Sequence, residues 1–286
     1  MKIVIGTANF NQKYGISHSK VKGLNEIKKI LNFLKRKNIR YIDTAFSYNL
    51  SKNFLSKLNF KSFKIITKLK LPLKKKKIFI EKLDIKIKNE LKIFGVNKFE
   101  AILLHDTNDI NSRYGDHLIA KLKELKKQKL VKNLGISVYE KKEIGISLKK
   151  LNLNIIQFPA NIFDQRFLNI NFLNKLKKSN IKCQIRSVFL QGLLIKDIKK
   201  IKKFKNKSIL RKKVLNLENW CKKNNITKKN ASLLFLKNHG KIDFLTLGID
   251  SLNQLKQNLA LLKINKIINL KRFATSNKQI IDPRKW

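Results

Sequence analysis

Acidic residues are scarce in this chain: 18 aspartates and glutamates stand against 66 lysines and arginines, for a formal net charge of +48. So basic a balance is typical of proteins that bind nucleic acid or an anionic membrane surface. The excess is mostly lysine, however, and it accompanies abundant isoleucine and asparagine, three residues with A/T-rich codons. The basic residues also run from Lys2 to Lys285 without a discrete tail. We therefore favour genome composition as their origin and expect no specific nucleic-acid partner, while an anionic partner stays open as the alternative.

Cysteine, histidine and long apolar runs are also rare. Cys183 and Cys221 form no Cys-x-x-Cys pair, which argues against a disulfide framework and fits a reducing, cytoplasmic compartment. The four histidines are scattered and show no metal-ligand spacing. No apolar run approaches the roughly 20 residues that span a membrane, and the strand-like start Met1–Gly6 does not resemble a signal peptide. We expect a cytoplasmic protein without a membrane span.

Linker sequences are missing as well. The chain has three prolines and no Gly/Ser-rich stretch, so we expect a single domain over residues 1–286. Short hydrophobic runs with β-branched residues alternate with longer segments, which is typical of parallel strands buried on both faces. Eight strands are predicted, at Lys2–Gly6, Arg40–Asp43, Ser62–Thr67, Phe99–Leu104, Val131–Ile136, Asn154–Phe158, Ile181–Ile185 and Ile242–Leu247.

Segments with apolar residues at helical spacing lie between these strands. In the first of them Ile27, Ile30 and Leu34 share one face, and Asn25 and Ser251 are predicted to cap the first and last. Helices are predicted at Leu24–Lys37, Ile78–Leu91, His117–Lys127, Leu168–Ser179, Ser208–Lys223 and Ser251–Leu262. Eight strands alternating with helices, in a chain near the ~250 residues of a closed α/β barrel, predict the α/β class and a (β/α)8 TIM barrel.

Chemistry in such a barrel is located at the carboxyl ends of the strands. Each predicted strand delivers small or polar residues to that end. These residues are Gly6 with Thr7, Asp43, Lys68, His105, Ser137, Gln157, Arg186 and Gly248. Because eight separate segments show the same placement, we expect a functional site at this face of the barrel.

Asp43, Tyr48, Lys68 and His105 are the predicted catalytic group. A phenol has a pKa near ~10, and an ammonium at ~4 Å with an effective dielectric of ~20 contributes ~4 kcal/mol, enough to lower that pKa by up to ~3 units. Tyr48 would then act as a general acid near neutral pH. Lys68 needs a carboxylate partner to stay charged when buried, which Asp43 supplies, and His105 can orient a carbonyl oxygen. Each residue alone also has a structural interpretation, but their joint placement favours a site.

At these residues the chain resembles the aldo-keto reductase family over nearly its whole length. Asp43-Thr-Ala-Phe-Ser-Tyr48 is similar to the family's catalytic Asp-Thr-Ala-x-x-Tyr motif, and the strands ending at Lys68 and His105 are similar to its lysine and histidine strands. The resemblance implies Tyr48 as proton donor, Lys68 as the modulator of its pKa, Asp43 as the partner of the lysine and His105 as the group that orients the carbonyl. It implies reversible reduction of a small aldehyde or ketone.

The resemblance also implies NADPH or NADH as cofactor, bound without a Gly-rich dinucleotide fingerprint. Ser137 and Gln157 would hold the carboxamide, and backbone groups from Leu190 to Gly192 would bind the pyrophosphate. The residues that the resemblance assigns to the cofactor are Gly6, Thr7, Ser137, Gln157, Arg186, Leu190, Gly192, Gly248, Gln254, Gln257 and Asn258.

The chain departs from the family pattern around the cofactor. Arg186 replaces the tyrosine that stacks on the nicotinamide, and its planar guanidinium can stack instead. Where many NADPH-preferring members have a cation for the 2′-phosphate, this chain has Gly248 and Gln254 with acidic Asp250 adjacent, although Lys256 is near in sequence. NADPH and NADH are therefore both open.

The substrate pocket has few sequence signals. Tyr14, Phe46 and Tyr139 follow predicted strands and either form its wall or belong to the core. The segment Phe-Leu-Gln-Gly-Leu-Leu and the closing Asp282–Trp286 resemble members associated with bacterial surface-sugar pathways, so a sugar-derived carbonyl is one candidate substrate.

Three functions compete at this stage. The first is an NAD(P)H-dependent carbonyl reductase with a small-molecule carbonyl substrate. The second is a non-catalytic barrel that binds the nicotinamide cofactor as a sensor or regulatory subunit, which the intact group of four residues disfavours. The third is a nucleic-acid- or membrane-surface-binding protein, for which a clustered basic stripe or aromatic stacking platform would be expected and is not visible. The sequence does not indicate an oligomeric state.

Overall fold

The computed structural model describes residues 1–10, 15–16, 23–48, 52–201 and 208–286. Its strands run parallel and close into a barrel in which each strand pairs with the next and β8 pairs with β1. The strands are β1 (Lys2–Gly6), β2 (Tyr41–Asp43), β3 (Lys64–Leu69), β4 (Phe99–Leu104), β5 (Val131–Ser137), β6 (Ile155–Pro159), β7 (Lys182–Arg186) and β8 (Phe244–Gly248). The predicted (β/α)8 barrel is confirmed, with all eight strands in the expected order.

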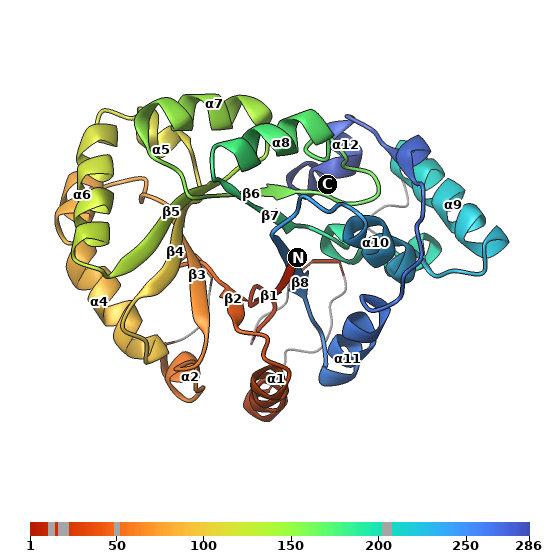
Figure 1. The fold of residues 1–286 in the computed structure, drawn as a ribbon, viewed down its shortest axis with the longest axis horizontal. Coiled ribbons are helices and arrows are strands. Elements are labelled where there is room, and N and C mark those ends of the chain that lie inside the picture. Colours follow the sequence, from red (N-terminus) through yellow and green to blue (C-terminus); the bar gives the residue numbers. More distant parts are fainter. Residues whose placement is uncertain (11–14, 17–22, 49–51, 202–207) are drawn as a thin grey trace.

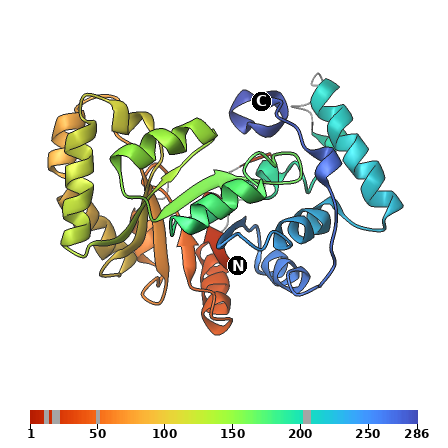
Figure 2. The ribbon, with the colours of Figure 1, turned by 45° about the horizontal axis from the view of Figure 1, so that its top comes forward.

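Helices surround the strands on the outside of the barrel (Figure 1), and a view tilted by 45° shows the same arrangement (Figure 2). The helices are α1 (Leu24–Arg36), α2 (Lys52–Ser56), α3 (Lys76–Glu81), α4 (Leu83–Phe94), α5 (Asn108–Asn111), α6 (Gly115–Lys127), α7 (Lys141–Lys150), α8 (Ile170–Lys178), α9 (Ser208–Lys223), α10 (Lys228–Lys237), α11 (Leu252–Leu261) and α12 (Lys278–Ile281). The predicted single helix Ile78–Leu91 is instead α3 and α4, because Lys82 departs from helical geometry with φ −93° and ψ 13°.

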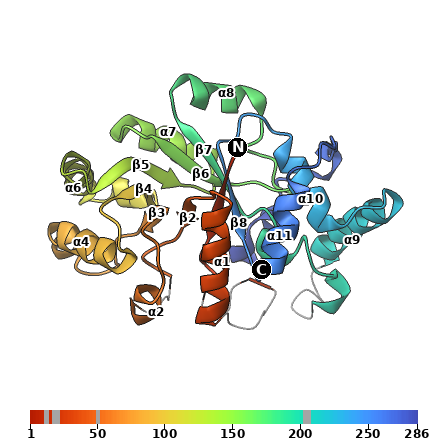
Figure 3. The same ribbon diagram turned by 60° about the horizontal axis from the view of Figure 1, so that its bottom comes forward.

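The helix ends follow simple capping chemistry. Ser251 caps α11 as predicted, since its hydroxyl accepts a hydrogen bond from the backbone N–H of Gln254. The prediction that Asn25 caps the helix is wrong: Asn25 lies inside α1, which begins at Leu24, and Gly23 occupies the N-cap position with extended backbone. α1 and α11 lie side by side (Figure 3), where the carboxylate of Glu26 accepts a hydrogen bond of 2.9 Å from the N–H of Leu252.

Two apolar layers hold the barrel. The larger one lies between the strands and the helices. The smaller one fills the barrel interior below the site, where Tyr41 and Phe244 bring their ring centres to 5.0 Å. This inner cluster consists of Val4, Tyr41, Ile66, Ala101, Leu103, Ile155 and Phe244. It forms an apolar floor on which the site is built.

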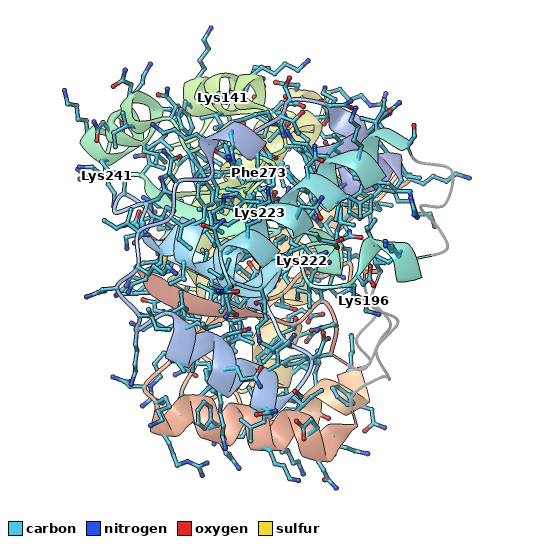
Figure 4. All side chains as sticks on the ribbon, turned by 90° about the vertical axis from the view of Figure 1, so that its right-hand side faces the viewer. Lys141, Lys196, Lys222, Lys223, Lys241 and Phe273 are labelled. Atoms are coloured by element: carbon cyan, nitrogen blue, oxygen red, sulfur yellow. The ribbon has the colours of Figure 1, made fainter. Side chains whose placement is uncertain are left out.

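The large positive charge is carried on the outside of the molecule. Lys141 on α7, Lys222 and Lys223 at the end of α9, and Lys241 before β8 are all exposed (Figure 4). Within the part of the chain that the structure describes, no helix is long and apolar enough to cross a membrane. The same residues contain no cluster of three or more histidine, cysteine, aspartate or glutamate side chains suited to a metal ion.

Candidate active site

The alternation of side chains along each strand places the site directly above the apolar floor. Successive strand residues point to opposite faces, so the residue two positions beyond a floor residue also points into the barrel. Tyr41, Ile66 and Leu103 are floor residues. The inward residues one step above them, and above their equivalents on other strands, are Gly6, Asp43, Lys68, His105, Ser137, Gln157, Arg186 and Thr246. Because of the strand period, residues from eight separate segments lie together in one mostly polar layer inside the barrel.

Asp43 is the centre of this layer. One carboxylate oxygen accepts a hydrogen bond of 2.5 Å from the ammonium of Lys68, and both side chains are almost fully buried. The other oxygen accepts from the amides of Gln157 at 2.7 Å and Gln184 at 2.9 Å. Lys68 also donates to the backbone carbonyl of Thr44 at 2.8 Å. The predicted Asp43–Lys68 pair is present and held by amides from two further strands, so neither charge can move independently.

Tyr48 lies beside this pair. The Lys68 ammonium is 5.5 Å from the centre of the Tyr48 ring. Burial nevertheless raises the pKa of Tyr48 above its ordinary 10, and the charge of Asp43 adds to this, while Arg186 opposes it. The predicted lowering of the tyrosine pKa is therefore wrong in direction: the phenol is removed from water, and Asp43, which is hydrogen-bonded to Lys68, adds a negative charge near it. Tyr48 thus holds its proton throughout the neutral pH range.

His105 stands at the end of β4 and is a neutral imidazole. Burial lowers its pKa to about 4, and the positive charges of Lys68 and Arg186 add to that shift. A neutral imidazole has one N–H donor and one acceptor nitrogen. At neutral pH His105 can therefore donate a hydrogen bond to a carbonyl oxygen without itself acting as the acid that protonates it.

A cleft of about 360 Å³ opens above these groups. All four predicted catalytic residues line it, as do Tyr139, Arg186 and Gln254. The other lining residues come from the ends of β1 and β8, from the segment that follows β7 and from the chain end: Gly6, Ala8, Asn9, Ser187, Val188, Phe189, Gln191, Gly192, Ile195, Lys196, Thr246, Gly248, Asp250 and Pro283. The cleft therefore extends from the phenol of Tyr48 towards the β7–β8 side of the barrel.

The residues predicted to bind cofactor have different positions relative to this cleft. Gly6, Arg186, Gly192, Gly248 and Gln254 lie in its wall. Thr7, Ser137 and Gln157 are buried behind the wall, where the Ser137 hydroxyl donates to the Gln157 amide oxygen at 2.8 Å. Leu190 and Asn258 are fully buried. Gln257 is exposed on α11, where its amide oxygen accepts from Lys229.

The segment after β7 has an unusual backbone. Ser187, Leu190 and Gln191 all have positive φ, and a short 3-10 helix spans Leu190–Gly192. Such turns can bring successive N–H groups to one side, where they favour anions. In this turn the N–H groups of Leu190 and Gly192 donate to the carbonyls of Ser187 and Phe189, at 3.0 and 2.9 Å. The N–H of Ile16 donates to the carbonyl of Gln191 at 2.9 Å, and a Cβ on Gly15 would come within 2.6 Å of that oxygen. A glycine is thus required where residues 15–16 pack on this segment.

Some residues of the site carry weak signals in the sequence. Gln184 was not predicted, although it stands two positions before Arg186 and so shares its inward face. Of the candidate pocket aromatics, Tyr139 lines the cleft, whereas Phe46 packs edge-on against Phe99 with ring centres 6.0 Å apart. Tyr14 lies outside the described residues.

Two comparisons connect this architecture to known proteins. The model of the aldo/keto reductase family matches residues 2–269. An aldo-keto reductase from Bacillus halodurans in its holo form superposes with a TM-score of 0.73 at 17% identity, covering 100% of this chain and 95% of that one. The glycerol dehydrogenase of Gluconobacter oxydans gives 0.66 at 16% identity, covering 98% and 92%. Comparison with curated protein sequences returns no significant match. The family model spans nearly the whole chain, and the chain therefore belongs to the aldo/keto reductase family.

Proposed function

We propose that this protein is an NAD(P)H-dependent reductase that converts an aldehyde or ketone to an alcohol, with Tyr48 as the proton donor. The observation that carries the proposal is the arrangement of a protonated phenol, a neutral imidazole and a buried lysine–aspartate pair around one cleft. Family membership supports carbonyl reduction in general, whereas the roles of individual residues rest on this geometry.

The reaction needs a hydride at the carbonyl carbon and a proton at its oxygen; a bound dinucleotide supplies the hydride. Tyr48 holds the proton, because burial and Asp43 raise the pKa of its phenol. The N–H of His105 orients the carbonyl oxygen towards that phenol. As negative charge develops on the oxygen, proton transfer from Tyr48 neutralises it.

Lys68 acts once the proton has moved. A phenolate at Tyr48 would have the ammonium of Lys68 at 5.5 Å from its ring centre, in a site shielded from water. Asp43 keeps that ammonium charged and in place, and the amides of Gln157 and Gln184 fix Asp43. The pair therefore acts on the tyrosinate formed during the reaction rather than on the resting phenol.

The chain offers groups that fit a dinucleotide. The segment of positive φ after β7 borders the cleft, and backbone N–H groups there that the turn does not itself use suit a pyrophosphate. Among the described residues neither amide atom of the fully buried Asn258 has a hydrogen-bond partner. An amide in that state suits a ligand edge that offers both a donor and an acceptor, such as an adenine. The ammonium of Lys256 lies 5.8 Å from the ring centre of Phe33.

The same cleft could serve a cofactor-binding sensor, and one variant separates the two functions. Tyr48→Phe removes the proton donor and leaves the ring in place. We expect reduction of aldehydes and keto-sugars to fall at least a hundredfold, in line with the ~10²–10⁴-fold contribution of general acids, while NADPH and NADH titrate as in wild type. Turnover within a few-fold of wild type would remove Tyr48 as donor. A wild-type protein that binds dinucleotide but reduces no member of the panel would favour the sensor.

A further inference from the structure

Arg186 carries a charge that no carboxylate of the described residues balances through an ion pair. It is half-buried at the end of β7 and lines the cleft. Its guanidinium donates to the backbone carbonyl of Val138 at 3.1 Å and makes longer contacts with the hydroxyls of Ser137 and Ser187. No described carboxylate forms an ion pair with it. Arg166 differs, since it pairs with Asp164 and Glu140. A half-buried guanidinium without an anion is costly unless a ligand supplies one.

A stack fixes the position of this guanidinium. The central carbon of Arg186 is 4.0 Å from the centre of the Tyr139 ring, and that of Arg284 is 3.5 Å from the same centre. Two guanidinium groups so close to one ring centre would overlap on a single face, so they lie on opposite faces. Asp282 holds Arg284 through hydrogen bonds of 2.7–3.2 Å. Arg284 is thus neutralised within the chain end, and Arg186 is not.

The charge of Arg186 reaches the reacting groups. It opposes the burial that raises the pKa of Tyr48, and it adds to the burial that lowers the pKa of His105. The other buried charges near these residues, on Asp43 and Lys68, neutralise each other at 2.5 Å. Among the described residues at the reaction end of the cleft, Arg186 therefore carries a positive charge without a carboxylate partner. Three of its five N–H groups make the contacts given above, and the other two remain to bind a ligand.

We propose that the substrate is a carbonyl compound that carries a carboxylate or phosphate, and that Arg186, held on Tyr139 by the chain end, binds this anionic group. The inference rests on the proposed reductase function and specifies its substrate class. Arg186 would then be a specificity-determining residue. Tyr139 and Arg284 would be positioning residues that act through it.

The test compares substrates that differ only in charge. We would measure kcat/KM for 4-carboxybenzaldehyde and its methyl ester, and for glyceraldehyde 3-phosphate and glyceraldehyde, in wild type and in Arg186→Met. Lys278→Met is the matched control, because Lys278 is an exposed cation that pairs with Glu140 and lies outside the cleft wall. We expect wild type to prefer the anionic member of at least one pair by roughly ten- to a hundredfold, the range of a charge-assisted hydrogen bond.

Each outcome decides the matter. Arg186→Met should reduce the preference to near unity, Arg186→Lys should keep part of it, Arg284→Met should reduce it partly, and Lys278→Met should keep it whole. The two pairs also distinguish the two anions. A preference for 4-carboxybenzaldehyde alone indicates a carboxylate substrate, and a preference for glyceraldehyde 3-phosphate alone indicates a phosphate. A preference for the neutral members, or one unchanged in Arg186→Met, would overturn the proposal. If Arg186→Met instead weakens NADPH and NADH binding and lowers kcat/KM equally for both members of each pair, Arg186 binds the dinucleotide and the proposal is wrong.

The proposal can also fail separately from the reductase function. If wild type reduces none of these compounds, thermal shifts with 4-(hydroxymethyl)benzoate and its methyl ester still report on the anion site. A shift with the acid alone that is lost in Arg186→Met would support the site without turnover. Equal shifts, or none in either ligand, would refute it.

Discussion

Asn258 offers the sharpest test of whether the cleft is built for a dinucleotide. Its side chain is fully buried on α11, and among the described residues both amide atoms lack a partner. A buried polar group without a partner costs about 1–3 kcal/mol. Because a water molecule in that space would relieve part of the cost, we take about 2 kcal/mol for the pair. Asn258→Leu keeps the approximate size and replaces the amide with an apolar group, so the free energy of unfolding of the ligand-free protein should rise by about this amount.

The measurement is thermal unfolding with and without nucleotide. At about 2–4 °C per kcal/mol for chains of this size class, ligand-free Asn258→Leu should melt about 4–8 °C above wild type. Nucleotide at a hundred times its Kd stabilises a protein by about 2.7 kcal/mol, and a tenfold weaker Kd reduces that to about 1.4 kcal/mol. The nucleotide-induced shift of the variant should therefore be about half that of wild type.

The control is Asn253→Leu, which changes an exposed asparagine of the same helix. It should alter neither the ligand-free melting temperature nor the nucleotide shift by more than a degree or two. An Asn258→Leu protein that is less stable without ligand would show that the amide is satisfied. One that gains as much from nucleotide as wild type would show that Asn258 does not contact it.

Three further predictions concern pH, packing and charge. His105 has a pKa of about 4 in the folded state against an ordinary 6.5, so the unfolded chain binds its proton first as pH falls. The free energy of unfolding should therefore drop by up to about 3 kcal/mol between pH 6.5 and 4. Urea titrations at pH 5 and 7.5 measure this change, and His105→Gln should remove the part that comes from the histidine. A pH dependence that is unchanged in His105→Gln would refute the assignment. Gly135→Ala would place a Cβ 2.3 Å from the carbonyl oxygen of Ile155 in the neighbouring strand, so soluble yield should collapse, whereas Gly145→Ala, which meets nothing within 4 Å, should express normally. DNA binding should be weak, sequence-independent and steeply salt-sensitive; selective binding that survives moderate salt in a filter assay would contradict the compositional origin of the charge.

Local sequence patterns were sufficient for the strands and for most of the larger helices. The strands are short, apolar and bounded by polar ends, and an amphipathic helix such as α1 has an apolar face with a clear period. α10 escaped prediction because its residues from Ala231 to Leu236 are all buried, which leaves no period to detect. α7 escaped because only Ile144 and Ser147 on it are buried, so its apolar face is narrow.

The sequence by itself determined the barrel and the place of its four central polar residues, because the strand period of two and the parallel order of strands bring every strand end to one face. Only the tertiary structure decided how those residues act on one another. Burial raises the pKa of Tyr48 and the charge of Asp43 adds to it, and the two amides that fix Asp43 are 114 and 141 positions away in the chain. The stack of Arg186, Tyr139 and Arg284 joins three distant segments in the same way. Burial and electrostatic fields depend on distances between side chains in space, and the order of residues along a chain does not contain those distances.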